Sequence, residues 1–354
     1  GNEESYISLD PELLFQAVEE ALVTAYKKNF GSNQNVRVDM NKVTGELHIY
    51  AQRHIVAEVG DDPNEISLEE ARKIDPRYEV DDIVETEVTP RNFGRIAAQN
   101  AKQVVVQRIR EAERGMVFEK FSSRENDIVT GIIQRMENKN VYIDLGKAEA
   151  ILTPNEQIPG EIYQYHDRMK TYIVEVKKTS KGPQIMVSRT HPGLLKRLFE
   201  LEVPEIHDGL VEIKSVAREP GMRSKISVYT KDENIDPVGA CVGHKGMRVQ
   251  TIVNELRGEK IDIVKYSSEP DQYVANALSP AKVVSTEVLE EEKICRVIVP
   301  DYQLSLAIGK EGQNARLAAK LTGWKIDIKS ESQAAEEAEQ GAQEVGVAYE
   351  ADED

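Results

Sequence analysis

The chain has 354 residues, with 45 lysines and arginines against 62 aspartates and glutamates, and its formal net charge is −17. A protein that coats nucleic acid without selection is basic overall, so this balance excludes that class. A chain of this length has room for about two to four domains. It contains no run of about eighteen apolar residues, which excludes a helix that spans a membrane.

Residue types that carry chemistry are not grouped in this sequence. Cys241 and Cys295 lie in apolar stretches and are too few for a disulfide framework, which predicts reduced core residues in a cytoplasmic protein. The first residues do not have the pattern of a secretory signal. The six histidines lack metal-ligand spacing, and phosphate-loop, G-x-S-x-G and H-E-x-x-H motifs are absent. We therefore expect no catalytic site, no metal and no cofactor.

Residues 1–124 predict an N-terminal α/β domain. Asp10 and the proline after it are typical of a helix start, and apolar residues then recur at helical spacing. Alternating runs on both sides of residues 43–45 predict a hairpin. Residues 67–70 form a capping box that opens a short helix, and a strand follows at residues 81–88.

Residues 91–121 predict one long helix with an apolar stripe. Its other face is basic and carries Arg95, Lys102 and Arg108. These charges have two interpretations, which are a solvated helix face and a surface that contacts a partner.

Residues 125–200 predict a small barrel. Five short β-rich runs separated by turn signals favour the five-stranded OB type. Barrels of this kind bind RNA with basic residues and stacking rings. The candidate contacts are Lys139, Tyr142, Tyr165, His166, Arg168 and Lys170. The alternative for the two tyrosines is that they only pack.

Two later segments repeat one pattern. Gly243-His244-Lys245-Gly246 and Gly309-Lys310-Glu311-Gly312 are each followed by an amphipathic helix and a strand that contains Lys-Ile-Asp-Ile. One G-x-x-G can be a plain turn, but its repetition indicates one structural unit used twice. The units cover residues 201–268 and 269–331, each in the order helix, strand, strand, helix, helix, strand. The link between them is short, so we expect one continuous surface.

The glycine loops suit a phosphate. Glycine lets the backbone approach a ligand closely, and the helix after each loop directs free N–H groups towards it. The local charge is basic, since residues 239–257 hold Lys245, Arg248 and Arg257 against only Glu255. The candidate RNA contacts are Gly243, His244, Lys245, Gly246, Arg248, Gly309, Lys310, Gly312, Gln313, Asn314 and Arg316. Glu311 is unfavourable beside a phosphate, so it either points to solvent or caps the next helix.

Both units resemble KH domains, the RNA-binding modules whose G-x-x-G loop clamps a nucleotide backbone. Residues 236–252 are similar to the first KH domain of the NusA family of transcription factors, and residues 306–318 are similar to its second. Residues 93–104 resemble the long helix of that family's N-terminal domain. The barrel resembles the ribosomal-protein type of OB domain, with Gly131 in its first strand.

The resemblance implies a cytoplasmic factor, not an enzyme, that binds RNA polymerase and nascent RNA and modulates pausing, hairpin-dependent termination and antitermination. It implies that Arg95, Lys102 and Arg108 contact the polymerase near the RNA exit. Other elongation and antitermination factors are expected partners, and we expect a monomer. Two alternatives stay open. One is an RNA-binding subunit of another RNA-processing assembly, such as an exosome-like cap, and the other is an enzyme with a hydrolytic site in the first 120 residues.

Beyond Ser330 the acidic residues have no lysine or arginine among them, which predicts a disordered acidic tail. The sequence therefore predicts a multidomain α+β protein in five parts. They are an N-terminal polymerase-binding domain (1–124), an OB-type RNA-binding barrel (125–200), two tandem KH domains (201–268 and 269–331) and the tail (332–354).

Overall fold

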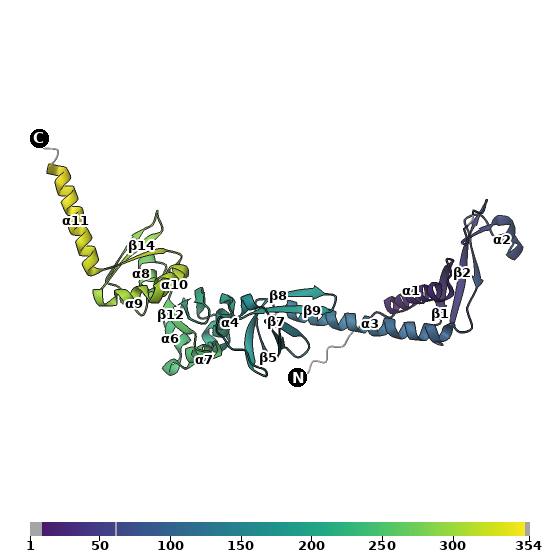
Figure 1. Ribbon diagram of the computed structural model, residues 1–354, viewed down its shortest axis with the longest axis horizontal. Coiled ribbons are helices and arrows are strands. Elements are labelled where there is room, and N and C mark those ends of the chain that lie inside the picture. The colour runs from purple at the N-terminus through teal and green to yellow at the C-terminus, as the bar shows by residue number, and fades with distance from the viewer. Residues whose placement is uncertain (1–8, 61, 351–354) are drawn as a thin grey trace. The chain divides into compact units, whose positions relative to one another are not determined.

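The structure, a computed structural model, describes residues 9–60 and 62–350, with side chains described as far as residue 341 (Figure 1). The chain divides into two compact units between Val117 and Phe118. Within the described ranges, no helix is both long and apolar enough to cross a membrane.

The first unit packs helices against a four-stranded sheet, as an α/β domain requires. Its elements are α1 (Pro11–Phe30), β1 (Asn35–Met40), β2 (Leu47–Val56), β3 (Glu65–Ser67), α2 (Leu68–Ile74), β4 (Ile83–Glu87) and α3 (Phe93–Ser122).

Local signals in the sequence explain where these elements begin. The Asp10 carboxylate accepts the Glu12 N–H at 3.0 Å at the start of α1. The Ser67 hydroxyl accepts the Glu70 N–H at 3.2 Å at the start of α2. The predicted hairpin of β1 and β2 is confirmed. The main core lies between α1, α3 and the sheet, with Leu22, Ile49 and Phe93 among its buried residues.

The second unit begins with the predicted barrel, which is closed in the order β5-β6-β7-β9-β8. A Cβ atom on Gly131 would lie 2.4 Å from Ile143 Cγ2, so the barrel wall requires a glycine there. A 3-10 turn at Pro154–Glu156 follows the strand β7 (Glu149–Leu152). The strands are β5 (Ile128–Glu137), β6 (Asn140–Asp144), β7 (Glu149–Leu152), β8 (Arg168–Thr179) and β9 (Gly182–Ser188).

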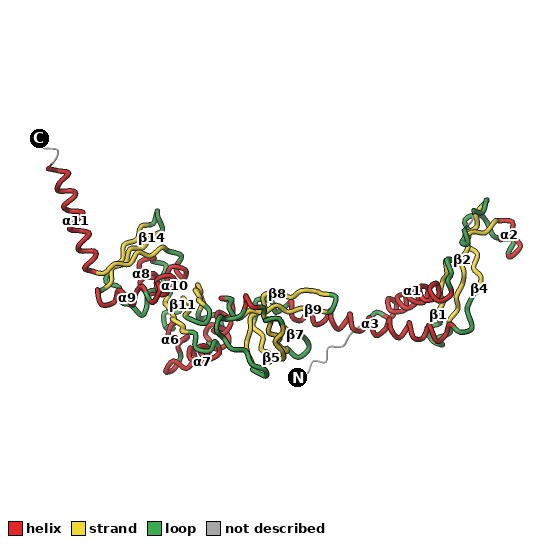
Figure 2. Tube along the Cα trace, viewed as in Figure 1, coloured by secondary structure: helices red, strands yellow, loops and turns green. Residues whose placement is uncertain are grey.

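Both KH units have the predicted element order, and Figure 2 shows their helices in red and their strands in yellow. In each sheet the last strand pairs in parallel with the middle one. Helix α4 shares the core of the first unit. The first unit consists of α4 (Pro192–Glu202), α5 (Pro204–His207), β10 (Glu212–Glu219), β11 (Arg223–Tyr229), α6 (Pro237–Val242), α7 (Met247–Glu255) and β12 (Lys260–Lys265). The second consists of α8 (Pro270–Ala277), β13 (Ser285–Leu289), β14 (Ile294–Val299), α9 (Leu304–Ile308), α10 (Gln313–Thr322) and β15 (Lys325–Ser330).

The two KH units pack directly on each other. Ala217 and Val264 of the first unit belong to the buried core of the second. The Tyr273 hydroxyl of α8 donates to Ser227 Oγ at 2.7 Å, and the buried Lys225 ammonium donates to the Ser279 carbonyl at 2.7 Å. The short link therefore joins two units that form one body, as the sequence predicted.

Helix α11 (Glu331–Glu350) lies in the segment that the sequence predicts as an acidic tail. The Gln333 N–H donates to Ser330 Oγ at 3.2 Å, and the Ser330 N–H donates to Gln333 Oε1 at 3.1 Å, so a capping box begins this helix. Alanine, glutamate and glutamine, which dominate the segment, are strong helix formers. Residues 351–354 lie outside the described residues.

Candidate nucleic-acid interface

The two glycine loops have the same backbone conformation. Gly243 and Gly309 have φ values of 77° and 79°, and the third loop residues, Lys245 and Glu311, are left-handed with φ values of 51° and 55°. The closing glycines, Gly246 and Gly312, have φ values of 73° and 72°. The repeat seen in the sequence is therefore a repeat of three-dimensional structure.

Helices α7 and α10 begin directly after the loops, and within the described part of the chain no side chain caps their first turns. Their N–H groups consequently remain available beside the loop, and the positive end of the helix dipole favours an anion there. This arrangement can bind a nucleic-acid phosphate without a metal or a cofactor.

The residues at the loop tips are exposed and differ in charge. His244 and Lys245 are exposed in the first loop, and Lys310 and Glu311 are exposed at the same two positions of the second. Among the described residues, the Glu311 carboxylate has no hydrogen-bond or ion-pair partner, so it points to solvent and does not cap α10. Lys245 and Glu311 thus occupy equivalent positions with opposite charge.

Arg248 and Asn314, five residues after the first glycine of each loop, brace the loops. Arg248 Nη1 donates to the Ala240 carbonyl at 2.7 Å and pairs with Glu205 at 2.9 Å. Asn314 Nδ2 donates to the carbonyls of Ala307 at 2.9 Å and Leu278 at 3.0 Å. The sequence predicted both as RNA contacts, but their polar groups are engaged within the protein.

Two further predicted contacts of the second loop are also placed by the structure. Gln313, the first residue of α10, is half-buried, and its Nε2 atom has no partner among the described residues. Arg316 forms an ion pair with Glu219 of the first KH unit at 2.5 Å. Its guanidinium is therefore already occupied by a carboxylate.

The barrel brings its candidate contacts onto its outer wall. Arg168 is exposed and lies opposite Ile132 in the β5–β8 ladder. Lys139 is exposed in the β5–β6 turn with a φ of 66°. The ring of Tyr142 is covered by the Arg135 guanidinium at 4.2 Å, so one face of this ring is not free for a base.

Arg135 is a basic surface residue that the sequence analysis missed. It also pairs with Glu149 at 2.9 Å. The hairpin register places Arg135 opposite Tyr142, which is the signal that would have found it. Tyr165 and His166 are both exposed beside the start of β8, whereas the backbone N–H of Lys170 donates to Glu255 Oε1 at 2.9 Å where the barrel meets α7.

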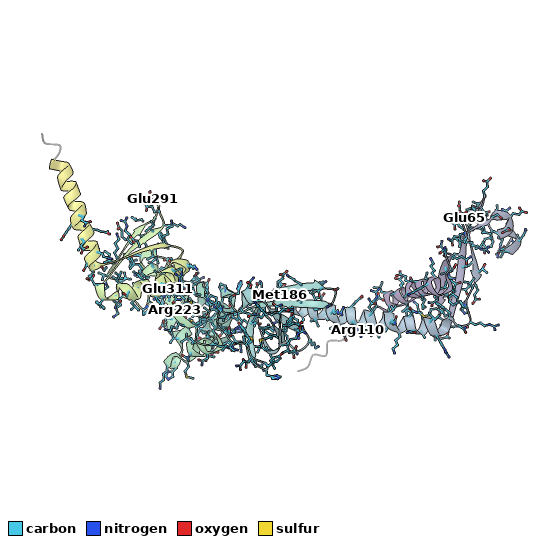
Figure 3. All side chains as sticks on the ribbon, in the orientation of Figure 1. Glu65, Arg110, Met186, Arg223, Glu291 and Glu311 are labelled. Carbon is cyan, nitrogen blue, oxygen red and sulfur yellow. The ribbon has the colours of Figure 1, made fainter. Side chains whose placement is uncertain are left out.

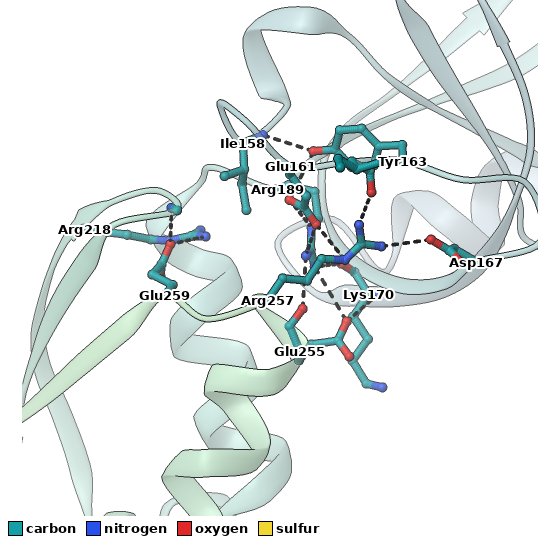
Figure 4. A network of polar contacts seen from close by, with 12 residues as sticks. Ile158, Glu161, Tyr163, Asp167, Lys170, Arg189, Arg218, Glu255, Arg257 and Glu259 are labelled. Carbon is teal, nitrogen blue, oxygen red and sulfur yellow. Dashed lines mark hydrogen bonds and ion pairs between the residues drawn. The ribbon is translucent and has the colours of Figure 1, made fainter.

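A buried polar network joins the barrel to the first KH unit (Figure 4). The Arg189 side chain is fully buried. Its Nη2 donates to Glu161 Oε1 at 2.5 Å and to the Glu255 carbonyl at 3.1 Å. Arg257 contacts the Ile162 carbonyl and lies 3.4 Å from Asp167. Glu161 lies in the barrel segment and Glu255 ends α7, so Arg189 holds the two modules together.

A second buried ion pair lies next to this network. Arg218 and Glu259 have fully buried side chains, with Arg218 Nε 3.0 Å from Glu259 Oε2. Arg218 Nη1 also donates to the His191 carbonyl at 2.9 Å, and Glu259 Oε1 accepts the Gly221 N–H at 2.7 Å. Burial lowers the pKa of the Arg218 guanidinium, which Glu259 opposes. Sequence patterns did not identify this pair.

Comparison with known proteins gives consistent matches along the chain. Family models match as the NusA N-terminal domain over residues 6–115, the S1 RNA binding domain over 122–188, the NusA-like first KH domain over 189–266 and the NusA-like second KH domain over 270–336. The transcription termination/antitermination protein NusA of Halalkalibacterium halodurans is 66% identical over 328 residues, covering 93% of this chain and 86% of that protein. The chain belongs to the NusA family.

The NusA protein of Bacillus subtilis is also 66% identical over 328 residues, covering 93% of this chain and 88% of its own length. The solution structure of the N-terminal domain of NusA from B. subtilis is 55% identical, covers 31% of this chain and 90% of its own, and has a TM-score of 0.29. The barrel predicted as an OB type corresponds to the S1 domain of this NusA-family chain.

The basic residues of α3 in this NusA-family chain lie on two faces. Arg95 and Lys102 are seven residues apart and therefore share one face of the helix. Lys102 lines the same surface as Val106 and Arg110, and Figure 3 labels Arg110. Arg108 instead lines a groove between α1 and α3 with Ala17 and Glu20. The sequence grouped Arg95, Lys102 and Arg108, whereas the structure separates Arg108 from the others.

The cysteines of the chain take no part in the interface. Both are buried and form no disulfide. Burial raises the pKa of the Cys241 thiol to about 12 and also raises the pKa of Cys295. Both thiols therefore stay protonated at neutral pH, and they serve as small core residues. Within the described ranges no cluster of three or more histidines, cysteines and acids could hold a metal.

Proposed function

We propose that this protein is a transcription termination/antitermination factor that binds nascent RNA with its S1 barrel and KH units and RNA polymerase with its N-terminal domain. The observation that carries the RNA-binding part is the pair of G-x-x-G loops with one backbone conformation, each followed by an uncapped helix start. The transcriptional role is supported by its relatives, which are transcription termination/antitermination proteins. The protein acts in the cytoplasm as a monomer, by binding and not by catalysis, alongside other elongation and antitermination factors.

The RNA contacts of the first KH unit are the loop residues Gly243 to Gly246. Lys245 is exposed at the tip and neutralises a phosphate, while the loop N–H groups donate to its oxygens. Gly309, Lys310 and Gly312 do the same in the second unit. Phosphate contacts of this kind provide affinity and register, and base contacts provide sequence preference.

The barrel adds a weaker contact through Arg168, Lys139 and the free face of Tyr142. Arg168 and Lys139 are exposed, and an exposed cation can follow an RNA backbone. Arg95 and Lys102 form the polymerase-facing side of α3, where both are exposed. Arg108 contributes through the separate groove between α1 and α3.

The test is a salt titration of RNA binding with the intact protein and with a double variant, Lys245→Asp and Lys310→Asp. We expect weaker binding and a slope of log affinity against log salt that is shallower by roughly one to two charges. The matched control is Lys28→Asp with Lys73→Asp, which makes the same charge change at exposed residues of the N-terminal domain.

Polymerase capture is measured on the same samples. The proposal requires the loop variant to lose RNA affinity while it still captures RNA polymerase. Unchanged RNA binding would show that the loops are structural turns. If the loop variant loses polymerase capture while the control variant keeps it, the KH loops take part in polymerase binding. That result would contradict the assignment of polymerase binding to the N-terminal domain.

A further inference from the structure

Arg316 makes three hydrogen bonds that connect the second glycine loop to the first KH unit. Its Nε and Nη2 atoms donate to Glu219 Oε1 at 2.8 and 2.5 Å. Its Nη1 atom donates to the carbonyl oxygen of Glu311 at 3.0 Å. Glu311 is the left-handed residue at the loop tip, so one guanidinium links this strained position to the end of β10.

The first glycine loop has no equivalent link. Gln250 stands four residues after Gly246, as Arg316 stands four residues after Gly312. Gln250 Nε2 donates to Asn254 Oδ1 at 2.9 Å, which lies in the same helix. The first loop therefore has its conformation without support from a neighbouring unit at this position, whereas the second is supported by the first KH unit.

Glu219 lies beside Arg218 on β10, and the two adjacent residues bind different modules. Arg218 donates to the His191 carbonyl just before α4 and pairs with Glu259. Glu219 accepts from Arg316 of α10. The end of β10 thus contacts His191, just after the barrel, and Arg316, which hydrogen-bonds to the second loop.

We propose that Arg316 is a positioning residue, which holds the second glycine loop in its RNA-binding conformation from strand β10 of the first KH unit through Glu219. The loop arrives at RNA preformed, so the two loops act as one ordered surface. This inference rests on the proposed function, because it concerns how the second loop of an RNA-binding surface is prepared.

The rival role for Arg316 is direct contact with a phosphate. The two roles predict opposite effects on RNA affinity when Glu219 is removed. If Arg316 binds phosphate, removing Glu219 frees a cation and removes an acid, which strengthens RNA binding. If Arg316 positions the loop, removing Glu219 weakens RNA binding although the protein becomes less acidic. The two outcomes have opposite sign.

The experiment measures the affinity of a labelled single-stranded RNA, long enough to reach both loops, for Glu219→Ala, Arg316→Ala and the double variant. We expect each single variant to bind about three- to fivefold more weakly, the range of a half-exposed ion pair, and the double variant to bind no more weakly than Arg316→Ala. Amide hydrogen exchange of Glu311 and Gly312 should become faster in both singles.

The control is the Arg296–Glu287 ion pair, which is exposed on the sheet of the same KH unit with its charged atoms 3.5 Å apart. Glu287→Ala should not weaken RNA binding, since that pair supports no loop. Arg316→Lys keeps the charge but loses the guanidinium fork that reaches Glu219 and Glu311 together, so we expect it to bind as weakly as Arg316→Ala.

Full affinity in Arg316→Lys, or unchanged or tighter binding in Glu219→Ala, would overturn the positioning role. Trp324 fluorescence checks that the second KH unit stays folded, because Trp324 is the single tryptophan of the chain. If Glu219→Ala does not fold, Arg316→Lys alone decides the question. A native protein that binds no RNA at all would instead contradict the proposed function itself.

Discussion

Arg248 in the first KH unit and Asn314 in the second occupy the same position after their glycine loops and do the same work with different chemistry. Each binds a carbonyl near the end of the preceding helix, at Ala240 or Ala307. Each also reaches the first helices of its own unit, through Glu205 or Leu278. The two loops share a polar brace at this position, although the charge of the brace differs between them.

The two KH units also differ in the contacts that join each of them to the domain before it in the chain. The first KH unit is joined to the barrel by the buried Arg189–Glu161 pair. Beside it, Arg218 is paired with Glu259 inside the first KH unit, with both side chains buried, and donates to the His191 carbonyl just after the barrel. The second unit is joined to the first by shared apolar core and by the buried Lys225, which binds Asp262 and the Ser279 carbonyl. Buried ion pairs tolerate the loss of one partner poorly, whereas an apolar boundary tolerates the loss of one polar contact better.

The largest expected effect comes from breaking the buried Arg218–Glu259 pair beside the barrel joint. Arg218→Met leaves Glu259 buried and without its cation, which we expect to cost about 3–5 kcal/mol of unfolding free energy. Lys225→Met should cost less, about 1–3 kcal/mol, because Asp262 keeps Arg223 as a partner at 2.7 Å. Urea denaturation followed by far-UV circular dichroism measures both variants.

If Arg218→Met and Lys225→Met lower the free energy of unfolding by the same amount, the proposed difference between the two joints is wrong. For Asp262, burial raises the pKa but the hydrogen bonds from Arg223 and Lys225 leave it below its usual value, so this carboxylate stays charged at neutral pH. The Lys225 variant therefore keeps a paired ion at the joint, while the Arg218 variant does not.

The first glycine of a loop should matter more than the closing one. A Cβ on Gly309 would lie 2.7 Å from the Asn314 backbone nitrogen, and the residue has a φ of 79°. We expect Gly309→Ala to cost about 2–4 kcal/mol. Gly312→Ala meets no atom closer than 3.9 Å and should cost about 1 kcal/mol from its positive φ alone. Urea titration monitored by Trp324 fluorescence compares them, and equal costs would mean that the close approach to Asn314 is relieved by a shift.

The brace itself should have a smaller effect. Arg248→Ala and Asn314→Ala each remove hydrogen bonds to backbone carbonyls, and we expect a loss of about 1–2 kcal/mol in both. Because Arg248 is half-buried and its partner Glu205 remains partly solvated, the two losses should be similar despite the difference in charge. Thermal denaturation of the two variants measures this loss. A negligible effect of Asn314→Ala would show that the Asn314 hydrogen bonds do not stabilise the second loop.

Local patterns predicted the elements of this fold, and longer-range partners determined the parts that were missed. Asp10 and Ser67 are caps that act over two or three residues, so the sequence showed where their helices begin. Arg316 and Glu219 are 97 residues apart, and no spacing rule connects them. For the same reason Arg248 was predicted as an RNA contact, because its pairing with Glu205 depends on the packing of α5 against α7.

The interface could be predicted as far as its backbone. The glycines, the repeat and the order of elements placed both loops correctly, because they depend on local conformation. Which cations are free to meet RNA depends on the carboxylates that folding brings to them. Lys245 has no such partner among the described residues and stays available, whereas Arg316 does not.

The smallest and most specific effect concerns the charge at the loop tips. Lys245 and Glu311 share one backbone conformation and one exposed position, so exchanging their charges leaves the fold intact. Lys245→Glu should weaken RNA binding about three- to tenfold, and Glu311→Lys should strengthen it by a similar factor. The slope of log affinity against log salt should fall in the first variant and rise in the second, each by about one charge. If Glu311→Lys weakens binding instead, the carboxylate accepts hydrogen bonds from base edges, and the second loop reads sequence where the first binds backbone.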